Sequence, residues 1–339
     1  MNTQITSFQT VLDSLLDMKK DFPRRYLNQF SDIGPLELQA LQEVWPRVGL
    51  SRKLTLLEEL ESLADEDTLV SFDDFARPLL NDPDAAVRVR ALRLLNESED
   101  VKLILSILNL LRHDADANVR AEAAVTLGHF VALGELEEIP WETYNQVQAG
   151  LLESVRGEDE SRVRRHALEA LGFSSDEEVV KLIESALNKR DSEWQASALI
   201  AIGRSADDRW EEEVLLGLTD ADDRIRMAAV QAAGNLALKS ARPILLRMLE
   251  EEDDDDVTTS IIWSLSQIGG EDVRTYLENL LDQAEDEDQT EFLEEALDNL
   301  TFTEDLDRFE LMSFNPDEIE AFEDDDEVLV DEDEEEDDK

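Results

Sequence analysis

The chain has 339 residues, of which 42% are hydrophobic and 6% aromatic, with 12 Gly and 8 Pro. This composition predicts an aliphatic core in a mostly helical fold, and it argues against a turn-rich β-sandwich or barrel. Cysteine is absent, which excludes disulfides, thiolate metal sites and a cysteine nucleophile.

The formal net charge of −53 at pH 7 is spread along the chain. Residues 315–339 contain 16 acidic residues and one Lys, and the remainder still contains 68 acidic residues against 30 Lys and Arg. Such a surface repels nucleic-acid phosphates and speeds encounters with basic proteins. We therefore expect a basic protein partner and no nucleic acid. Adaptation to a salty cytoplasm would produce the same excess of acids, so both explanations stay open.

Residues 1–10 lack the basic and apolar segments of a signal peptide. No stretch approaches the roughly 18–20 apolar residues that a membrane span needs. These observations predict a cytoplasmic protein that does not enter a membrane.

Residues 1–65 are predicted to form an N-terminal helical cap outside the repeat pattern that follows. Amphipathic spacing indicates helices at Ile5–Met18, Pro35–Val44 and Lys53–Leu63. A cap is expected here because the first unit of a stacked array would otherwise expose its inner face.

A short pattern then recurs, in which an acidic residue is followed three positions later by Val, Ile or Trp. This apolar marker falls at residues 87, 119, 163, 194, 225 and 257, so the steps are 32, 44, 31, 31 and 32 residues. Apolar residues four, five and eight positions after the marker form one helical face. Each unit is therefore predicted to be a helix pair whose second helix opens at the acid, which caps it.

The first helices of the units are predicted at Val101–Leu111, Tyr144–Val155, Val179–Leu187, Trp210–Leu218, Ala241–Leu249 and Val273–Leu281. Glycines follow the apolar face at Gly128, Gly172, Gly203, Gly234 and Gly269, where a helix can end in a left-handed cap.

Two departures from the period are visible. Residues 132–140 lengthen one unit and are expected to bulge as a loop on one rim. The pattern fades after Phe302, and residues 303–339 are predicted to be an acidic, mostly disordered tail.

The strings DPDAAVRVRALRLL, DANVRAEAAVTLG and SRVRRHALEALG resemble HEAT repeats of the short type named for phycobilisome lyases. The resemblance covers roughly residues 70–300, and it implies an all-α, right-handed α-solenoid over residues 66–302. It also implies a ladder between units, with Asp84, Asp116, Glu160 and Asp222 as the acids and Arg88, Arg120, Arg164 and Arg226 as the bases. Trp194-Gln195 and Val257-Thr258 interrupt the row of arginines.

The sequence contains no convincing pattern of catalytic or metal-binding residues. The histidines, His113, His129 and His166, fall on different units, and the His-Glu pairs of the iron-dependent hydroxylases of this repeat class are missing. The run from Asp114 to Asn118 begins like a calcium loop, but Val119 occupies the position that requires Gly. Phosphate-binding and serine-nucleophile motifs are absent. We expect no catalytic residue, metal or cofactor.

The resulting prediction is a non-catalytic scaffold, monomeric on its own. Because second helices normally line the concave side of such a solenoid, the candidate partner-binding residues are Arg90, Glu122, Arg165, Gln195 and Gln231. Phe314 and Phe322, set among acids, form a candidate docking motif in the tail, and a purely solubilising tail is the alternative. The alternative function is an accessory lyase-like or hydroxylase-like subunit.

The five tryptophans have two interpretations. Trp141 and Trp210 open first helices and are predicted to pack on the rim, whereas Trp194 replaces the Val marker and is predicted in the core. The functional alternative is an aromatic anchor for a partner, since Trp often dominates binding energy.

Overall fold

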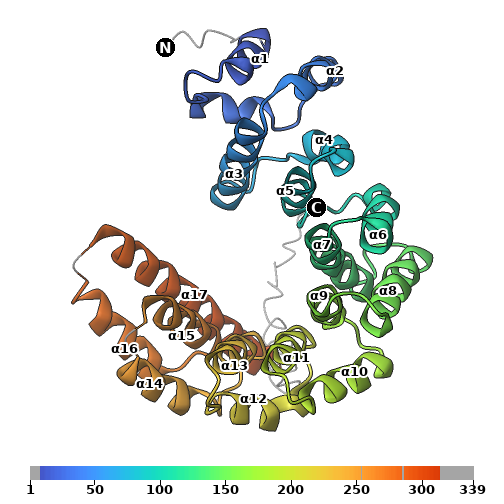
Figure 1. The fold of residues 1–339 in the computed structure, drawn as a ribbon. Helices are drawn as coiled ribbons and strands as arrows, with labels where there is room; N and C mark the ends of the chain where they lie inside the picture. Colours follow the sequence, from blue (N-terminus) through green and yellow to red (C-terminus); the bar gives the residue numbers. More distant parts are fainter. Residues whose placement is uncertain (1–7, 253, 285, 314–339) are drawn as a thin grey trace, which may run out of the picture. The chain divides into compact units, whose positions relative to one another are not determined.

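The computed structural model describes residues 8–252, 254–284 and 286–313. Every regular element in these ranges is a helix, and the helices follow one another in pairs (Figure 1). The prediction of an all-α solenoid is confirmed. The chain divides into two compact units, Met1–Ala232 and Ala233–Lys339.

The N-terminal unit begins with α1 (Phe8–Leu16), α2 (Pro35–Val44) and α3 (Leu50–Glu66). Phe30 is fully buried among them, and its ring centroid lies 5.1 Å from that of Phe75. The predicted helix at Pro35–Val44 matches α2 in both bounds, whereas α3 begins three residues before the predicted Lys53. Pro35 occupies the first turn of α2, where its missing N–H costs no hydrogen bond.

The helix pairs of this unit form two layers, with α5, α7, α9 and α11 in one and α6, α8, α10 and α12 in the other (Figure 1). Neighbouring helices of the first layer pack directly on one another. The bounds are α4 (Asp73–Ala76), α5 (Ala85–Leu94), α6 (Ile104–His113), α7 (Ala117–Glu135), α8 (Trp141–Arg156), α9 (Ser161–Leu171), α10 (Glu177–Leu187), α11 (Ser192–Arg204) and α12 (Glu211–Gly217).

Helix α13 (Asp223–Asn235) begins in the N-terminal unit and ends in the second, which continues with α14 (Arg242–Glu251), α15 (Asp255–Ile268), α16 (Glu271–Leu281) and α17 (Glu287–Ser313). Helix α15 packs against α14 and α17, around the buried Ile261 and Leu265. Helix α17 continues to Ser313, so the helical region extends past the boundary at residue 302 that the fading pattern suggests.

Aspartate caps fix where most second helices begin. Asp84, Asp116, Asp191 and Asp254 each accept a hydrogen bond from the backbone N–H two residues further on, at 2.8 to 3.1 Å. The predicted capping role is confirmed at these positions. Glu160 occupies the same place before α9 but makes no side-chain cap bond, because its longer side chain does not fold back as the Asp side chain does.

Three glycines of the repeat, Gly128, Gly172 and Gly234, allow close packing between neighbouring helices. Gly128, Gly203 and Gly234 lie inside helices, and Gly172 has a right-handed φ of −53°. A Cβ at Gly172 would lie 2.5 Å from the Ala201 carbonyl oxygen of α11. The left-handed prediction is therefore wrong at these four glycines. Gly269 ends α15 with a positive φ of 76°, but its ψ of 173° lies outside the left-handed helical region.

The lengthened unit also differs from its prediction. Residues 132–135 continue α7, and only residues 136–140 form the turn into α8. Glu137 in this turn has a φ of 60°, an uncommon conformation for a residue with a side chain. The insertion thus adds a helical turn and a short tight loop where a longer loop was expected.

Candidate functional site

A ladder of part-buried ion pairs joins successive units at the turns before the second helices. Arg88 donates from Nε and Nη2 to the two carboxylate oxygens of Asp114, both at 2.8 Å, and from Nη1 to the Asp82 carbonyl oxygen at 2.8 Å. Arg120 repeats this arrangement with Asp159, at 2.8 and 2.7 Å, and with the Asp114 carbonyl oxygen. Each arginine therefore ties its own turn to the turn of the next unit.

These contacts set the protonation of the acids. Burial alone would raise the pKa of Asp114, but hydrogen bonds from Arg88 and from the Asp116 N–H outweigh it and hold that pKa below its usual value. The Arg120 hydrogen bonds similarly lower the pKa of Asp159. Both carboxylates are therefore charged at neutral pH and act as fixed acceptors.

The ladder begins earlier than the repeat strings indicate. Lys53 Nζ donates to Asp82 Oδ2 at 2.8 Å, and Trp45 Nε1 donates to the same oxygen at 2.7 Å. Lys53 follows the cap position Gly49 by four residues, as Arg88 follows Asp84. The base of this rung lies within the residues assigned to the cap, whereas Asp82 lies within the repeat region. The rung escapes the pattern because Lys replaces Arg and Gly replaces the acid.

The structure corrects the acid half of the predicted ladder. Asp84 and Asp116 face the N–H groups of their own helices, and Asp222 pairs with Arg224 at 2.9 Å. The acids that bind the ladder arginines precede the predicted ones by two residues at Asp114 and by one at Asp159. A carboxylate that caps its own helix is not oriented toward the neighbouring unit, whereas the residue earlier in the turn is.

Toward α13, the residues at the base positions of the ladder make different contacts from those of Arg88 and Arg120. Arg164 Nε donates to the Val155 carbonyl oxygen at 3.0 Å, and its guanidinium lies 5.4 Å from the Trp194 ring centroid. Gln195 donates to the Leu187 carbonyl oxygen at 3.1 Å. Arg226 donates to the Asp220 carbonyl oxygen at 2.8 Å and pairs with Asp223. These three keep the contact to their own turn without a carboxylate bridge like that of Arg88.

Most of the predicted partner-binding residues have partners within the chain. Arg90 pairs with Glu58 and Glu61, Glu122 with Arg93, and Arg165 with Glu193. Gln195 is the ladder residue described above. Gln231 on α13 is exposed. Phe314 and Phe322 lie outside the described residues. Internal ion pairs thus occupy three of the side chains proposed to face a partner.

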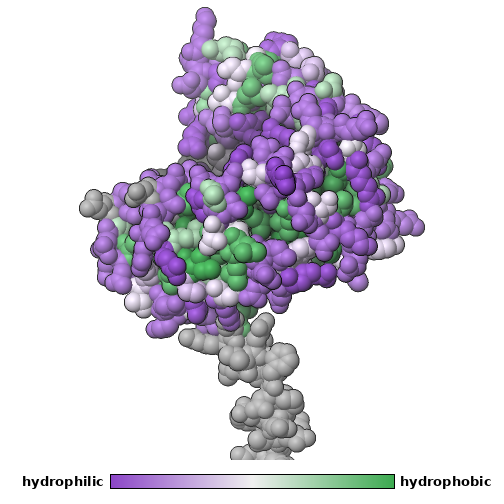
Figure 2. Space-filling model, turned by 60° about the horizontal axis from the view of Figure 1, so that its bottom comes forward, coloured by the Kyte–Doolittle hydropathy of each residue, from purple (hydrophilic) through white to green (hydrophobic). Residues whose placement is uncertain are grey.

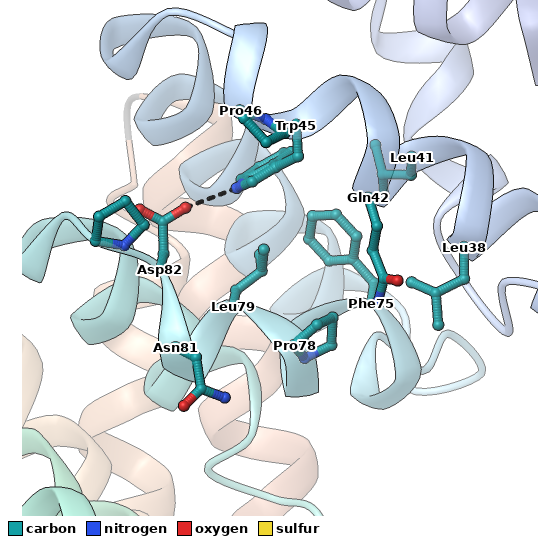
Figure 3. A pocket seen from close by; sticks show the side chains of 11 residues that line it. Leu38, Leu41, Gln42, Trp45, Pro46, Phe75, Pro78, Leu79, Asn81 and Asp82 are labelled. Carbon is teal, nitrogen blue, oxygen red and sulfur yellow. Dashed lines mark hydrogen bonds between the residues drawn. The ribbon is translucent and has the colours of Figure 1, made fainter.

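An apolar cavity of about 180 Å³ lies between α2 and the segment from α4 to Pro83 (Figure 3). Its walls include Leu38, Leu41, Phe75 and Pro78, and the Trp45 ring meets Phe75 edge to face at 5.9 Å. The carboxylate at its edge belongs to Asp82, whose hydrogen bonds go to Trp45 and Lys53. The cavity offers apolar contact and no free acid or base for chemistry.

A second pocket, which we call the acidic–aromatic pocket, lies where α7 ends and α8 begins. Its volume is about 360 Å³, and it is lined by Gly134, Glu135, Glu137, Trp141, Tyr144, Gln148, Ser175 and Asp176. The Trp141 side chain is 69% exposed, and its ring centroid lies 5.4 Å from that of the buried Tyr144. The prediction that Trp141 packs on the rim is therefore wrong, whereas Trp194 and Trp210 are buried at 6% and 4% exposure.

Hydrogen bonds hold the floor of this pocket. The Tyr144 hydroxyl donates to Glu135 Oε1, which also accepts the Ser175 N–H at 3.1 Å. Gln148 Nε2 donates to Ser174 Oγ at 2.9 Å. Burial, together with Glu135, raises the pKa of Tyr144 to about 12, so the phenol stays protonated and keeps donating.

Negative charge in the acidic–aromatic pocket is uncompensated. Glu135, Glu137 and Asp176 make no ion pair within the described ranges, and none of the eight lining residues is basic. Figure 2 shows hydrophilic side chains over most of one face of the molecule. An exposed indole beside three carboxylates is a surface suited to a cation.

Metal and membrane features can be reported for the described part of the chain. It contains no group of three or more His, Cys, Asp or Glu side chains that could hold a metal ion. No helix there is long and apolar enough to cross a membrane. His129 Nε2 and His166 Nδ1 are buried without hydrogen-bond partners, and burial lowers the pKa of His166.

Comparison with known families supports the repeat assignment. Residues 211–298 match the family of HEAT repeats. Within this chain, residues 211–298 are therefore HEAT repeats. No curated protein matches this chain.

Solved structures similar to this chain include YibA of Escherichia coli, with a TM-score of 0.40, 16% identity and coverage of 82% of this chain and 96% of that chain. The CpcE–CpcF complex of phycocyanin lyase from Nostoc sp. gives 0.45 and 17%, with coverage of 67% and 94%. Kap121p bound to Pho4p gives 0.43 and 15%, with coverage of 85% and 35%. Similarities at this level carry no argument about function.

Proposed function

We propose that this HEAT-repeat protein is a non-catalytic scaffold that binds a basic protein. The observation that carries the proposal is the distribution of charge. Arginines of the second helices, such as Arg88, Arg90 and Arg120, are held by acids of the chain itself. With a net charge of −53, the surface is left with carboxylates in excess.

Two physical arguments connect this charge to partner binding. Stacked helix pairs present an extended surface whose neighbouring units contribute together to one interface. Complementary charge speeds association and selects against acidic competitors. A basic protein, or a basic segment of one, meets both conditions.

The test is capture of partners from native lysate by the full chain and by a version ending at Phe314, at low and at moderate salt. One or two stoichiometric basic proteins that survive moderate salt would support the proposal. If only a salt-labile mixture of basic proteins is recovered, the chain acts as a generic polyanion and the proposal fails. Loss of a partner with the shortened version would place its binding in the tail.

Two other readings have direct tests. An absorption spectrum of the purified protein would reveal the pigment or iron that a lyase-like or hydroxylase-like subunit would carry. Unfolding upon desalting would indicate that the acidity is an adaptation to salt, since like-charge repulsion grows as screening falls.

A further inference from the structure

We infer that the acidic–aromatic pocket binds an arginine side chain, presented by a basic segment of the partner. This inference rests on the proposed function and assigns it a place on the molecule. The ligand is defined by its chemistry, because the pocket combines an exposed indole with carboxylates that no residue of the described chain neutralises.

The aromatic part of the pocket consists of an exposed ring, Trp141, against a fixed one, Tyr144. Trp141 sits at the first position of α8 with its ring tilted by 34° against Tyr144, and Tyr144 is fixed by Glu135 and Ser174. A cation over the face of an indole is attracted by the ring, and Trp is the strongest of the aromatic side chains in this respect. Because the Tyr144 ring is already held, little rotamer entropy is lost at this ring when a ligand binds.

The acidic part favours arginine over a simple point charge. Glu135 is oriented by Tyr144 and the Ser175 N–H, while Glu137 and Asp176 are exposed on the pocket wall. A planar guanidinium can stack on an indole while its N–H groups point toward carboxylates at its edge. Lysine offers the charge without this planar geometry.

A comparison within the chain shows why the occupant would come from outside. A polar cavity between α3, α5 and α7 is also lined by acids, among them Glu61, Glu97 and Glu122, but it contains Arg93. Arg93 pairs with Glu122 at 3.2 Å. The acidic–aromatic pocket is also lined by several acids, but none of its lining residues is basic.

The pocket is a product of the lengthened unit. The added turn of α7 supplies Gly134 and Glu135, and the turn after it supplies Glu137. A Cβ at Gly134 would lie 1.9 Å from the Tyr144 ring, so glycine is what allows the ring to reach its position. The regular 31- and 32-residue units have no counterpart of this segment.

The experiment measures the affinity of the full chain for a fluorescein-labelled oligo-arginine peptide by anisotropy, at about 50 mM and about 150 mM NaCl. A peptide of the same length with citrulline in place of arginine reports the contribution of charge. Trp141→Ala removes the indole, and Glu137→Gln removes one carboxylate without a change of size. Leu216→Ala and Glu212→Gln on α12 are matched controls, because Leu216 is 65% exposed and lies beside acids.

We expect Trp141→Ala to weaken arginine-peptide binding by about threefold to thirtyfold and Glu137→Gln by about twofold to fivefold. Both controls are expected to change binding by less than about twofold. Far-UV circular dichroism should show the same helical content in all variants, since the substituted side chains are exposed.

The outcomes separate the two proposals. If the Trp141 and Leu216 variants lose affinity equally, or neither loses any, arginine does not bind in the acidic–aromatic pocket and the inference is overturned, while basic-partner binding stands. If the native chain binds the arginine peptide no better than the citrulline peptide, the proposed function fails as well.

Discussion

Two aspartates that are neighbours in one turn are expected to contribute unequally to stability. The Arg88 guanidinium donates a hydrogen bond to each carboxylate oxygen of Asp114. The Asp114 side chain is 6% exposed and that of Arg88 is 14% exposed. Asp116 accepts only the Asn118 N–H at 2.8 Å. Substitution of each by Ala therefore compares a buried ion pair with a helix cap in nearly the same place.

The magnitudes follow from what each change leaves behind. Asp114→Ala strands the Arg88 guanidinium with the Asp82 carbonyl oxygen as its remaining acceptor and also removes the acceptor of the Asp116 N–H. Breaking such a pair costs about 3 kcal/mol. Asp116→Ala loses one cap bond, which costs about 1 kcal/mol. A double variant, Arg88→Met with Asp114→Leu, removes both charges and is expected to lie within about 1 kcal/mol of the native chain.

The assay is hydrogen exchange of α5, α6 and α7 together with urea unfolding followed by far-UV circular dichroism. Local exchange is included because stacked repeats need not unfold in one step. A loss of 3 kcal/mol corresponds to an increase of roughly 150-fold in opening of the affected turn. Equal losses for the two single variants, or a double variant as unstable as Asp114→Ala, would refute the ladder as described here.

Other expected outcomes concern further rungs and contacts. Lys53→Met leaves the Asp82 carboxylate, 2% exposed, without its cation, and we expect a loss of about 3 kcal/mol in urea unfolding; a loss below about 0.5 kcal/mol would contradict this. Gly172→Ala places a Cβ 2.5 Å from the Ala201 carbonyl oxygen, and the overpacking is expected to cost about 1–3 kcal/mol and to lower the melting temperature. Asp82 and Asp159 have lowered pKa values in the folded chain, so the unfolded state binds more protons in acid. Their stabilisation is complete above the unfolded pKa of about 4 and is lost as pH falls below it. An acid titration that shows this loss already complete at about pH 5 would argue against the pairs.

The periodic features of the sequence predicted the fold well. The marker positions place second helices where α5, α7, α9, α11 and α15 begin, because an aspartate before an apolar face specifies a helix start locally. The first helices were recovered for the same reason, with ends shifted by a few residues. Local hydrogen bonding and amphipathic spacing are sufficient for these elements.

Contacts between units were harder to predict. The resemblance to HEAT repeats implies Asp84 and Asp116 as ladder acids, yet an acid that recurs in every turn can serve its own helix. Only the path of the turn shows that Asp114 faces Arg88. Lys53 and Asp82 show the same limit, since their pairing depends on how α3 packs against the following turn, 29 residues away in sequence.

The candidate site was missed for a related reason. The 44-residue step predicts a loop at residues 132–140, whereas helix continuation to Glu135 depends on packing of α7 against α8 around Gly134 and Tyr144. Exposure of Trp141 follows from that packing and not from its neighbours in sequence. The available signal was the 44-residue step itself, which marked the irregular unit without showing its structure.

That irregular unit has a consequence for alignment. An array of similar units offers a bound chain several nearly equivalent positions, each displaced from the next by one unit. The acidic–aromatic pocket interrupts this translational equivalence, because among the described residues its combination of Gly134, Glu135 and Trp141 occurs in a single unit. A partner anchored in this pocket can therefore bind the array in only one position. Its contacts with the other units are then fixed in both position and chain direction.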